Sequence, residues 1–416
     1  MIRLMLIFVA LISAPQLLYA QIGVEEYCAD VLAYSHTLRD ERLATEGAYS
    51  EATARRKDYL PFFDLVRQMN LDFRSPEVGR RWSWLTRLDV SQPIFLGGKV
   101  RARAKQAQLA YDASVESGRA AEIFVRYTAE VAYWSLSRAE SNYNAMNDYH
   151  TIVSSLRDIV AERYAEGYIS KSDLLQVESR LSDAEYKLSS AAQQRDVALH
   201  NFNSLRGVEP ATRVSLAESI LTNAAMPRRE EVADIVLRHP DYAASRLDSE
   251  RAFWGIREVR AAYLPQIDLA LYGLWQPNMP HSKGGGTRLD GGVLLSFSTP
   301  IFHFGQRKHA VAAARSDYLR SENLSSEVVD DIKRDESDGW TNLLSTHDRV
   351  EATQRNLSIA RENLDISTYS YHEGVASILD VLQAQLSWLQ IYQNAIAAQY
   401  DYAVAVAAYR YIAVVE

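Results

Sequence analysis

The sequence is poor in the residues that disulfide-bonded, loop-rich or nucleic-acid-binding proteins use. Its one cysteine, Cys28, cannot form a disulfide within the chain. With a formal net charge of -8, the chain lacks the basic surface that nucleic-acid binding needs. We therefore expect no nucleic-acid partner. Glycine (18) and proline (11) are sparse among 416 residues, which favours long helices over a loop-rich fold.

Long apolar runs are missing after the start of the chain. Residues 1–20 have a positive charge at Arg3, a short apolar core and a plausible cleavage site ending in Ala20, which is the pattern of a secretory signal peptide. The alternative is a membrane anchor, but the core is shorter than the ~20 residues that a spanning helix needs. We predict cleavage after Ala20, and we expect Cys28 to be buried and inert.

The rest of the chain contains one pattern twice. Pro93-Ile94-Phe95 returns as Pro300-Ile301-Phe302, 207 positions later (300 minus 93). Tyr164-Ala165-Glu166-Gly167 matches Tyr371-His372-Glu373-Gly374 at the same spacing. Such self-similarity indicates an internal two-fold repeat. The predicted domains are a signal peptide at 1–20, a first repeat at 21–207, an equatorial linker at 208–226 and a second repeat at 227–416.

Each repeat has the same predicted order of elements. An opening helix ends at Leu-Pro, because proline cannot continue a helix. A β-hairpin, a very long helix, a tip turn at a glycine and a return helix follow. The opening helices are expected at Val24–Tyr59 and Arg229–Tyr263, the hairpins at about 62–92 and 266–299, and the tips near 167 and 374.

The hairpins alternate between apolar and polar residues. Phe63, Leu65 and Met69 are apolar and their neighbours are mostly polar, which is the period of strands with one apolar face. A soluble core could cover that face, but the neighbouring segments are helical, and Trp84 and Trp275 suit a membrane interface. Only a closed barrel satisfies strand backbones in lipid, and four strands cannot close one. Three chains would supply twelve.

The spacing also predicts a helical tunnel. The long helices, from about Pro93 to Gly167 and from Pro300 to Gly374, would each measure on the order of 110 Å at about 1.5 Å per residue. Each equals the summed length of one return helix and one opening helix. We therefore expect a mainly α fold with a small β part: a coiled-coil tunnel of long helices, plus a transmembrane β-barrel shared by a trimer, with four strands per protomer.

Several of these segments resemble the TolC family of outer-membrane efflux proteins. The segment Ser91–Gly98 is similar to the family's strand-to-helix entry, and Arg163–Gly167 and Tyr371–Gly374 are similar to its two tips. The resemblance implies a homotrimer in the cell outer membrane that extends into the periplasm. It also implies two further partners, a periplasmic adaptor (a membrane fusion protein) and an inner-membrane pump, besides the lipid of the outer membrane.

The resemblance assigns roles to residues at the tips. Asp380 matches an aspartate that lines the closed periplasmic mouth, and Gln383 stands where the family often has a second acid. Tyr371 and Asp173 match a pair whose hydrogen bond helps to hold the mouth shut. A simpler alternative is that both aspartates cap helices after a turn. The residues expected to contact the adaptor are Gly167, Tyr168, Ser170, Gly374, Val375 and Ser377.

Nothing in the sequence predicts catalysis. The histidines lack metal-ligand spacing, and no nucleophile motif or carboxylate pair stands in a plausible cleft. We expect no enzyme activity, no cofactor and no metal site. The leading hypothesis is passive conduction of solutes out of the cell by an exit duct. The alternatives are the outer component of a type I protein secretion system and a soluble periplasmic coiled-coil scaffold.

Overall fold

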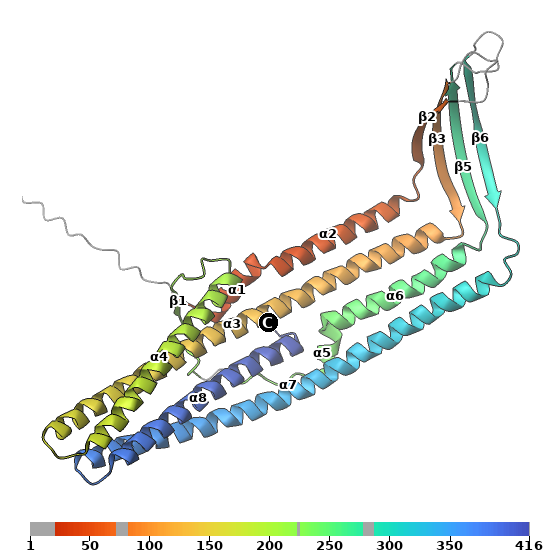
Figure 1. Cartoon of the computed structure of the whole chain (residues 1–416). Coiled ribbons are helices and arrows are strands. Elements are labelled where there is room, and N and C mark those ends of the chain that lie inside the picture. Colours follow the sequence, from red (N-terminus) through yellow and green to blue (C-terminus); the bar gives the residue numbers. More distant parts are fainter. Residues whose placement is uncertain (1–20, 72–81, 223–224, 278–286, 416) are drawn as a thin grey trace, which may run out of the picture. The chain divides into compact units, whose positions relative to one another are not determined.

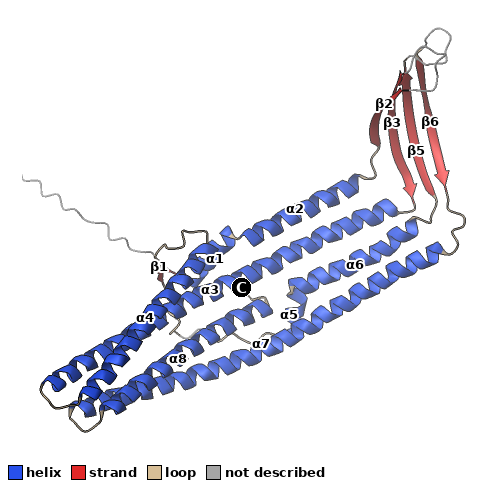
Figure 2. Ribbon diagram, in the orientation of Figure 1, coloured by secondary structure: helices blue, strands red, loops and turns tan. Residues whose placement is uncertain are grey.

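The computed structural model of the chain describes residues 21–71, 82–222, 225–277 and 287–415. The predicted signal peptide at 1–20 and the turns that join the strands of each hairpin lie outside these residues. In the described part the chain is mainly helical, with four long strands (Figures 1 and 2). The predicted fold class, mainly α with a small β part and an internal repeat, is confirmed. None of the described helices combines the length and the apolar character that crossing a membrane requires.

The chain folds into two compact units, and each unit contains segments of both repeats. The strand unit contains all four long strands, and the tip unit contains both tip turns. The long helices α3 (Lys99–Ala165) and α7 (Gln306–His372), of 67 residues each, contribute to both units. The strand unit consists of His36–Phe124, Arg228–Trp340 and the chain from Arg410, and the tip unit consists of the chain up to Ser35, Val125–Pro227 and Thr341–Tyr409.

The four long strands form one antiparallel sheet in the strand unit. They are β2 (Phe62–Leu71), β3 (Trp82–Leu96), β5 (Gln266–Gln276) and β6 (Arg288–Ser298). Their order is β2-β3-β5-β6, so the two predicted hairpins join through β3 and β5, and β2 and β6 are the two edges. Each edge strand presents a row of backbone groups that no described strand of this chain pairs.

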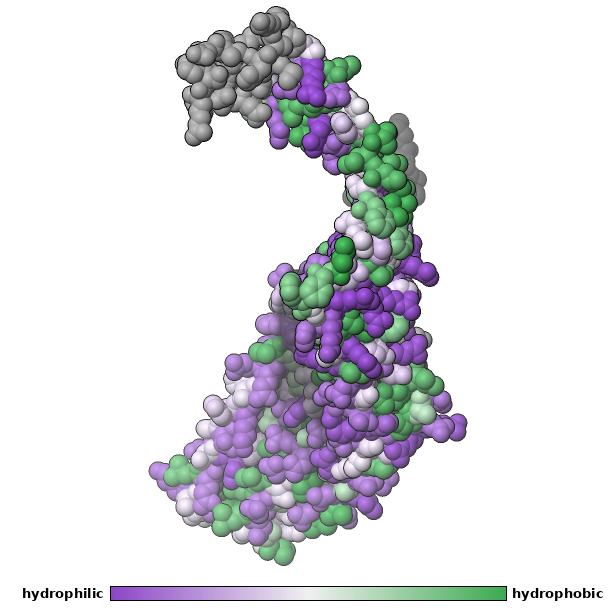
Figure 3. Space-filling view, turned by 90° about the vertical axis from the view of Figure 1, so that its right-hand side faces the viewer, coloured by the Kyte–Doolittle hydropathy of each residue, from purple (hydrophilic) through white to green (hydrophobic). Residues whose placement is uncertain are grey.

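One face of this sheet is apolar, as the alternation predicts. Phe63 lies opposite Val90, Val90 opposite Leu271, and Leu271 opposite Val293. Directly opposed residues share a face, so this row crosses all four strands on one side. The apolar side chains are exposed in the single chain, with Leu65 at 71%, and they gather along the sheet in the space-filling view (Figure 3). A neighbouring row on the other face reads Asp64, Asp89, Tyr272 and Gly292.

The two copies of the strand-to-helix segment differ in structure. The first hairpin was predicted to end near residue 92, but β3 continues to Leu96 because β5 pairs with it, with a register shift between Pro93 and Phe95. The equivalent residues 299–303 follow edge strand β6 and have no strand beside them among the described residues. Phe302 in this segment is 70% exposed.

Each predicted opening helix is broken in two, which corrects the expectation of one continuous helix. The first is divided into α1 (Val24–Tyr34) and α2 (His36–Lys57), and the second into α5 (Val232–Arg238) and α6 (Pro240–Ala261). The residues at the breaks, Ser35 and His239, have extended ψ angles of 122° and 124°. They lie 204 positions apart, so the break belongs to the repeat. At His239 the cause is the following proline, which disfavours helical geometry in the residue before it.

The described chain begins with a short strand in the tip unit that the sequence did not predict. Strand β1 (Gln21–Ile22) pairs in parallel with β4 (Ser215–Leu216). The hydroxyl of Tyr133 donates to the Ile22 carbonyl oxygen at 3.0 Å. These contacts fix the start of the chain beside the segment predicted to be the equatorial linker.

An aromatic cluster packs beneath that strand. The ring of Tyr27 stacks on Phe202 with centroids 3.9 Å apart, and its hydroxyl donates to the Phe202 carbonyl oxygen at 3.0 Å. Cys28 beside it is 1% exposed, and burial raises the pKa of its thiol to about 12. The prediction that Cys28 is buried is therefore confirmed, and the thiol form is unreactive.

The return helices α4 (Lys171–Leu205) and α8 (Ile378–Ala413) end in the same hydrogen-bonded turn. The amide of Val208 donates to Asn203 O at 3.0 Å, and the amide of Val415 donates to Arg410 O at 3.1 Å. The residue with positive φ is Gly207 in the first copy (φ 72°) and Val414 in the second (φ 52°). A β-branched residue is strained there, whereas glycine adopts this conformation at little cost.

We expect Val414→Gly to stabilise the protein by about 0.5–1 kcal/mol, because it removes the strain of a valine in the left-handed conformation. The greater backbone entropy of glycine in the unfolded chain offsets part of that gain. The midpoint of unfolding in detergent, measured by circular dichroism, tests this. Val415→Gly, at the exposed next position, is the control and should not stabilise. A lower midpoint for Val414→Gly would contradict the expectation.

Candidate functional site at the two helical hairpins

The first tip turn joins α3 to α4 and contains three of the predicted contact residues. Gly167 has φ 81°. Its amide donates to Tyr164 O at 3.0 Å, and the amide of Tyr168 donates to Arg163 O at 2.9 Å. This pair of bonds is the Schellman arrangement, in which a residue without Cβ reverses the chain and satisfies carbonyls at the helix end. Tyr168 is 77% exposed.

The second tip turn, between α7 and α8, repeats this geometry. Gly374 has φ 75°, and its amide donates to Tyr371 O at 3.0 Å. The amide of Val375 donates to Ser370 O at 2.9 Å. Val375 is 83% exposed. Each hairpin therefore presents one large, exposed apolar or aromatic side chain immediately after its glycine.

Both predicted aspartates cap the helix that follows the turn. The Ser170 hydroxyl donates to Asp173 Oδ2 at 2.9 Å, and the Asp173 amide donates back to Ser170 Oγ at 3.3 Å, which forms a capping box at α4. At α8 the Ser377 hydroxyl donates to Asp380 Oδ2 at 2.7 Å, and the Asp380 amide donates to Ser377 Oγ at 3.3 Å. The simpler alternative of helix capping is thus observed for both aspartates.

These hydrogen bonds have an electrostatic consequence for Asp380. The hydroxyl and the backbone amide of Ser377 both donate to the carboxylate, and they hold the pKa of Asp380 below its ordinary value. Asp380 therefore keeps its negative charge to lower pH than a free aspartate. Gln383, one helical turn further on, is exposed and adds no charge.

An apolar cluster packs the two hairpins together within the tip unit. It contains Tyr371 at the end of α7, which is 5% exposed, and residues of α3, α4 and α8. Burial of such side chains is the main favourable term in the packing of helices. The fully buried members from the two return helices are Val177 and Val381.

The predicted hydrogen bond between Tyr371 and Asp173 is not present within the described single chain. The buried Tyr371 hydroxyl has no partner there, and the Asp173 carboxylate accepts from Ser170 instead. Burial raises the pKa of Tyr371, so its hydroxyl stays protonated as a donor. A buried donor without a partner is costly. An acceptor supplied from outside the single chain would remove that cost.

Arg163, the first residue of the predicted tip segment, makes a contact that the sequence did not predict. Its Nη1 donates to Tyr371 O at 3.1 Å and its Nη2 donates to His372 O at 2.7 Å. The guanidinium carbon lies 5.0 Å from the centroid of the Tyr371 ring, within cation–π range. Its counterpart 207 positions later is Ser370. Because the two residues differ, the similarity between the repeats gives no signal for Arg163.

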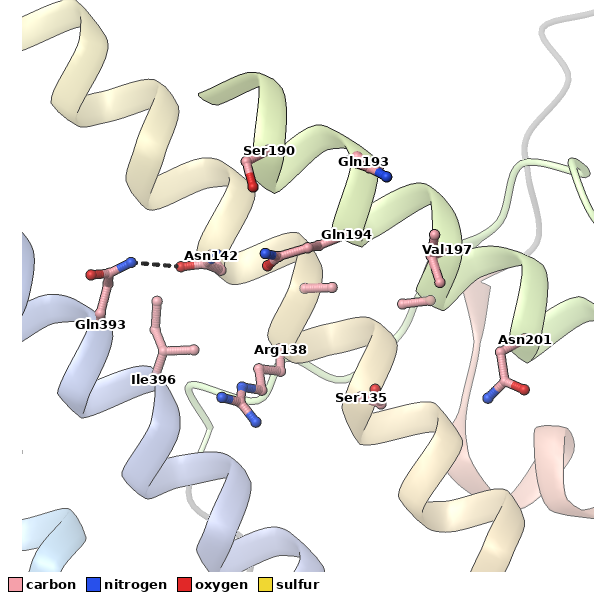
Figure 4. Close-up of a pocket in the computed structure, with 12 residues that line it drawn as sticks. Ser135, Arg138, Asn142, Ser190, Gln193, Gln194, Val197, Asn201, Gln393 and Ile396 are labelled. Carbon is pink, nitrogen blue, oxygen red and sulfur yellow. Dashed lines mark hydrogen bonds between the residues drawn. The ribbon is translucent and has the colours of Figure 1, made fainter. Parts of the chain in front are cut away.

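A separate pocket of about 760 Å³ lies between α3, α4 and α8 in the tip unit (Figure 4). Its lining mixes uncharged polar side chains with alanine, valine and isoleucine. Gln393 Nε2 donates to Asn142 Oδ1 at 3.5 Å, and Arg138 is the charged side chain of the lining. The pocket contains none of the predicted site residues and no carboxylate that could act with a base. Among the residues that the structure describes, no group of histidine, cysteine, aspartate and glutamate side chains could hold a metal ion.

Comparison with known proteins gives a family match over most of the chain. The model of the family described as outer membrane efflux protein matches twice, at residues 28–208 and 232–412. Two matched segments of one family agree with the internal repeat. This family consists of transport channels, so the chain is not an enzyme.

Individual relatives are distant in sequence and similar in fold. Protein CyaE of Bordetella pertussis is 26% identical over 300 residues, which cover 70% of this chain and 62% of the relative. Outer membrane protein TolC of Escherichia coli is 23% identical over 330 residues, covering 76% of this chain and 66% of TolC. The chain thus spans slightly less than two thirds of the length of these curated relatives.

Among solved structures, the channel protein CusC superposes with a TM-score of 0.81 at 16% identity, covering 95% of this chain and 92% of CusC. At that identity the match concerns the fold, and it agrees with the four-stranded sheet and the two long helices α3 and α7 described above. The family model covers both repeats, from the first helix of the described chain to the last. The chain belongs to the outer membrane efflux protein family.

Proposed function

We propose that the chain is one protomer of a homotrimeric exit duct in the outer membrane, which extends into the periplasm and conducts solutes passively out of the cell. Energy would come from an inner-membrane pump, connected through a periplasmic adaptor. The single observation that carries this proposal is the amphipathic sheet with two open edges. Its exposed apolar face suits lipid, and its edges need partners.

The number of strands supports the trimer. In the hydrocarbon region every backbone donor and acceptor has to be paired, so only a closed barrel is stable there. The four strands of one chain are fewer than the eight of the smallest known membrane barrels. Three chains supply twelve strands, and β6 of each chain would then pair with β2 of the next.

The repeat predicts the register of that pairing between chains. Within one chain Leu88 lies opposite Gly273. The counterpart of Leu88 in the second repeat is Leu295, and the counterpart of Gly273 in the first is Met69, at the offsets of 207 and 204. Leu295 of one chain should therefore lie opposite Met69 of the next, which keeps both side chains on the apolar face.

The two hairpins would form the periplasmic mouth and the adaptor contact. Tyr168 and Val375 are exposed directly after the tip glycines, as a docking surface for a helical partner requires. Asp380 of three chains would form a carboxylate ring that attracts cations. Since Gln383 is neutral, a second ring is missing. The predicted adaptor contacts at Gly167, Ser170, Gly374 and Ser377 remain part of this proposal.

A second candidate within the same fold is the outer component of a type I protein secretion system, since both conduits need the same wall and the same tips. A soluble periplasmic scaffold is the candidate of another class. The exposed apolar face of the sheet argues against it, because contiguous apolar surface in water favours aggregation. Stable association with the outer membrane separates either duct from the scaffold.

Cysteine pairs test the predicted contact between chains. Leu295→Cys with Met69→Cys should form a disulfide between chains and give cross-linked products of up to three chains on a non-reducing gel, because directly opposed strand residues lie within disulfide reach. Cys28 is buried and can stay in place.

The matched control is Leu295→Cys with Arg67→Cys, which is shifted by two residues on the same face of β2. It should cross-link poorly. Preferential cross-linking of the shifted pair would refute the register, and no cross-link from either pair would refute the pairing of β6 with β2.

Loosening the hairpins should open the mouth. Tyr371→Phe together with Asp173→Ala should raise single-channel conductance in planar lipid bilayers, since Asp173→Ala removes the cap of α4 and Tyr371→Phe removes the hydroxyl that we propose donates to an acceptor in the assembled mouth. Asp241→Ala, at the start of α6 in the strand unit, is the control for loss of an acidic side chain in the first turn of a helix. A double variant that conducts like the wild type would count against a role in closure.

The charge of Asp380 predicts selectivity and its pH dependence. Because the pKa of Asp380 is lowered, the carboxylate keeps its negative charge at any pH above the pKa of a free aspartate, about 3.9. It loses that charge only at lower pH. The wild-type pore should therefore prefer cations at mildly acidic pH, and Asp380→Asn should reduce that preference. Reversal potentials in a salt gradient measure it. Equal potentials for both proteins would exclude Asp380 from the conducting path.

A further inference from the structure

We propose that Arg163 is a positioning residue of the mouth: it ties the α7–α8 hairpin to the end of α3 and so holds the conduit closed. This role rests on the proposed function, because it concerns the mouth of the same conduit. We call the contacts of Arg163 with Tyr371 and His372 the tie. Its acceptors are backbone carbonyl oxygens, whereas the predicted bond between Tyr371 and Asp173 joins two side chains.

The end of α7 needs donors that its own turn does not fully supply. The last turn of a helix leaves carbonyl oxygens without intrahelical partners. Tyr371 O accepts from the Gly374 amide at 3.0 Å and also from Arg163 Nη1 at 3.1 Å. His372 O accepts from Arg163 Nη2 at 2.7 Å. One guanidinium on α3 therefore caps two consecutive carbonyls of α7.

The charge of Arg163 strengthens this cap. The C-terminal end of a helix carries a partial negative charge, so a cation there is favourable. Hydrogen bonds from an ionised donor are shorter and stronger than neutral ones, and 2.7 Å at His372 O is a short bond. The planar fork of arginine reaches two acceptors at once, which the single ammonium of lysine does not do with the same geometry.

Arg163 also contacts the residue that anchors α7 in the apolar cluster. Its guanidinium carbon lies 5.0 Å from the centroid of the Tyr371 ring, and Tyr371 is 5% exposed within that cluster. The guanidinium thus bonds the backbone of Tyr371 and covers its ring. If α7 moved away from α3, both hydrogen bonds and the ring contact would be lost together.

The tie is asymmetric between the repeats. The position equivalent to Arg163 is Ser370, which is uncharged, and its carbonyl oxygen is used by the amides of Val375 and Ala376 within the same turn. The arginine therefore acts on the second hairpin and has no counterpart that acts on the first. This asymmetry makes the α7–α8 hairpin the one that the Arg163 contacts hold.

The experiment compares three variants of the full mature chain in planar lipid bilayers. Arg163→Gln removes the charge and the fork, and we expect the open fraction to rise about tenfold, the change that corresponds to about 1.4 kcal/mol. Arg163→Lys keeps the charge and should give an intermediate rise. Arg157→Gln is the matched control, since Arg157 lies on the same helix and pairs with its neighbour Asp158 at 3.3 Å. It should behave as the wild type.

The outcomes distinguish a failure of the role proposed for Arg163 from a failure of the proposed conduit function. If Arg163→Gln conducts like the wild type, or only lowers the thermal midpoint of the trimer, Arg163 is a structural cap and the proposal is overturned. If Arg163→Gln does not assemble, Arg163→Lys decides the question, and an unchanged open fraction overturns it. If the wild type itself forms no pore, the proposed function fails and the tie fails with it.

Discussion

The unpaired backbone of the two sheet edges is the constraint on which the rest of the molecule depends. Strands β2 and β6 each offer a row of donors and acceptors, and in lipid an unpaired row costs several kcal/mol for each group. The apolar face keeps the sheet out of water, and the open edges make a single chain unstable in lipid. Both conditions are met when chains share one wall. The segment 299–303, which has no strand beside it among the described residues, would gain one at the same contact.

The repeat accounts for what the two halves of the chain share and for where they differ. The same glycine turn and the same Ser–Asp capping box occur at both tips, with Asp173 and Asp380 in equivalent places. The copies differ where their surroundings differ. The first strand-to-helix segment lies beside β5 and is a strand, whereas the second borders an edge and is not. Arg163 stands where the second copy has Ser370, so the two tips differ in charge at this position.

Local patterns predicted most of the fold. Alternating residues such as Phe63 and Leu65 identified the strands, because period two follows directly from strand geometry. The glycine after each long helix identified the tips, because positive φ is cheap only without a Cβ. The two-fold spacing of 207 positions then fixed the order of elements. The first two signals act between neighbours in sequence, and the third needs only a comparison of the chain with itself, so the sequence alone carries all three.

Long-range contacts account for what the sequence did not predict. Of the two helix breaks, the one at His239 has a local signal in the proline that follows it. The break at Ser35 has no such proline. The pairing of β1 with β4 joins residues about 194 positions apart, and the contact of Arg163 with the end of α7 joins residues 208 and 209 positions apart. For Asp380 and Asp173 the sequence predicted helix capping as the simpler alternative, and the structure confirms the caps.

The central claim is that the chain completes its sheet only with other copies of itself in a membrane. Native mass spectrometry of the mature protein, extracted from the outer membrane in detergent, tests this most directly. The account predicts a particle of three chains that requires detergent. A monomer that stays soluble in water without detergent would contradict it.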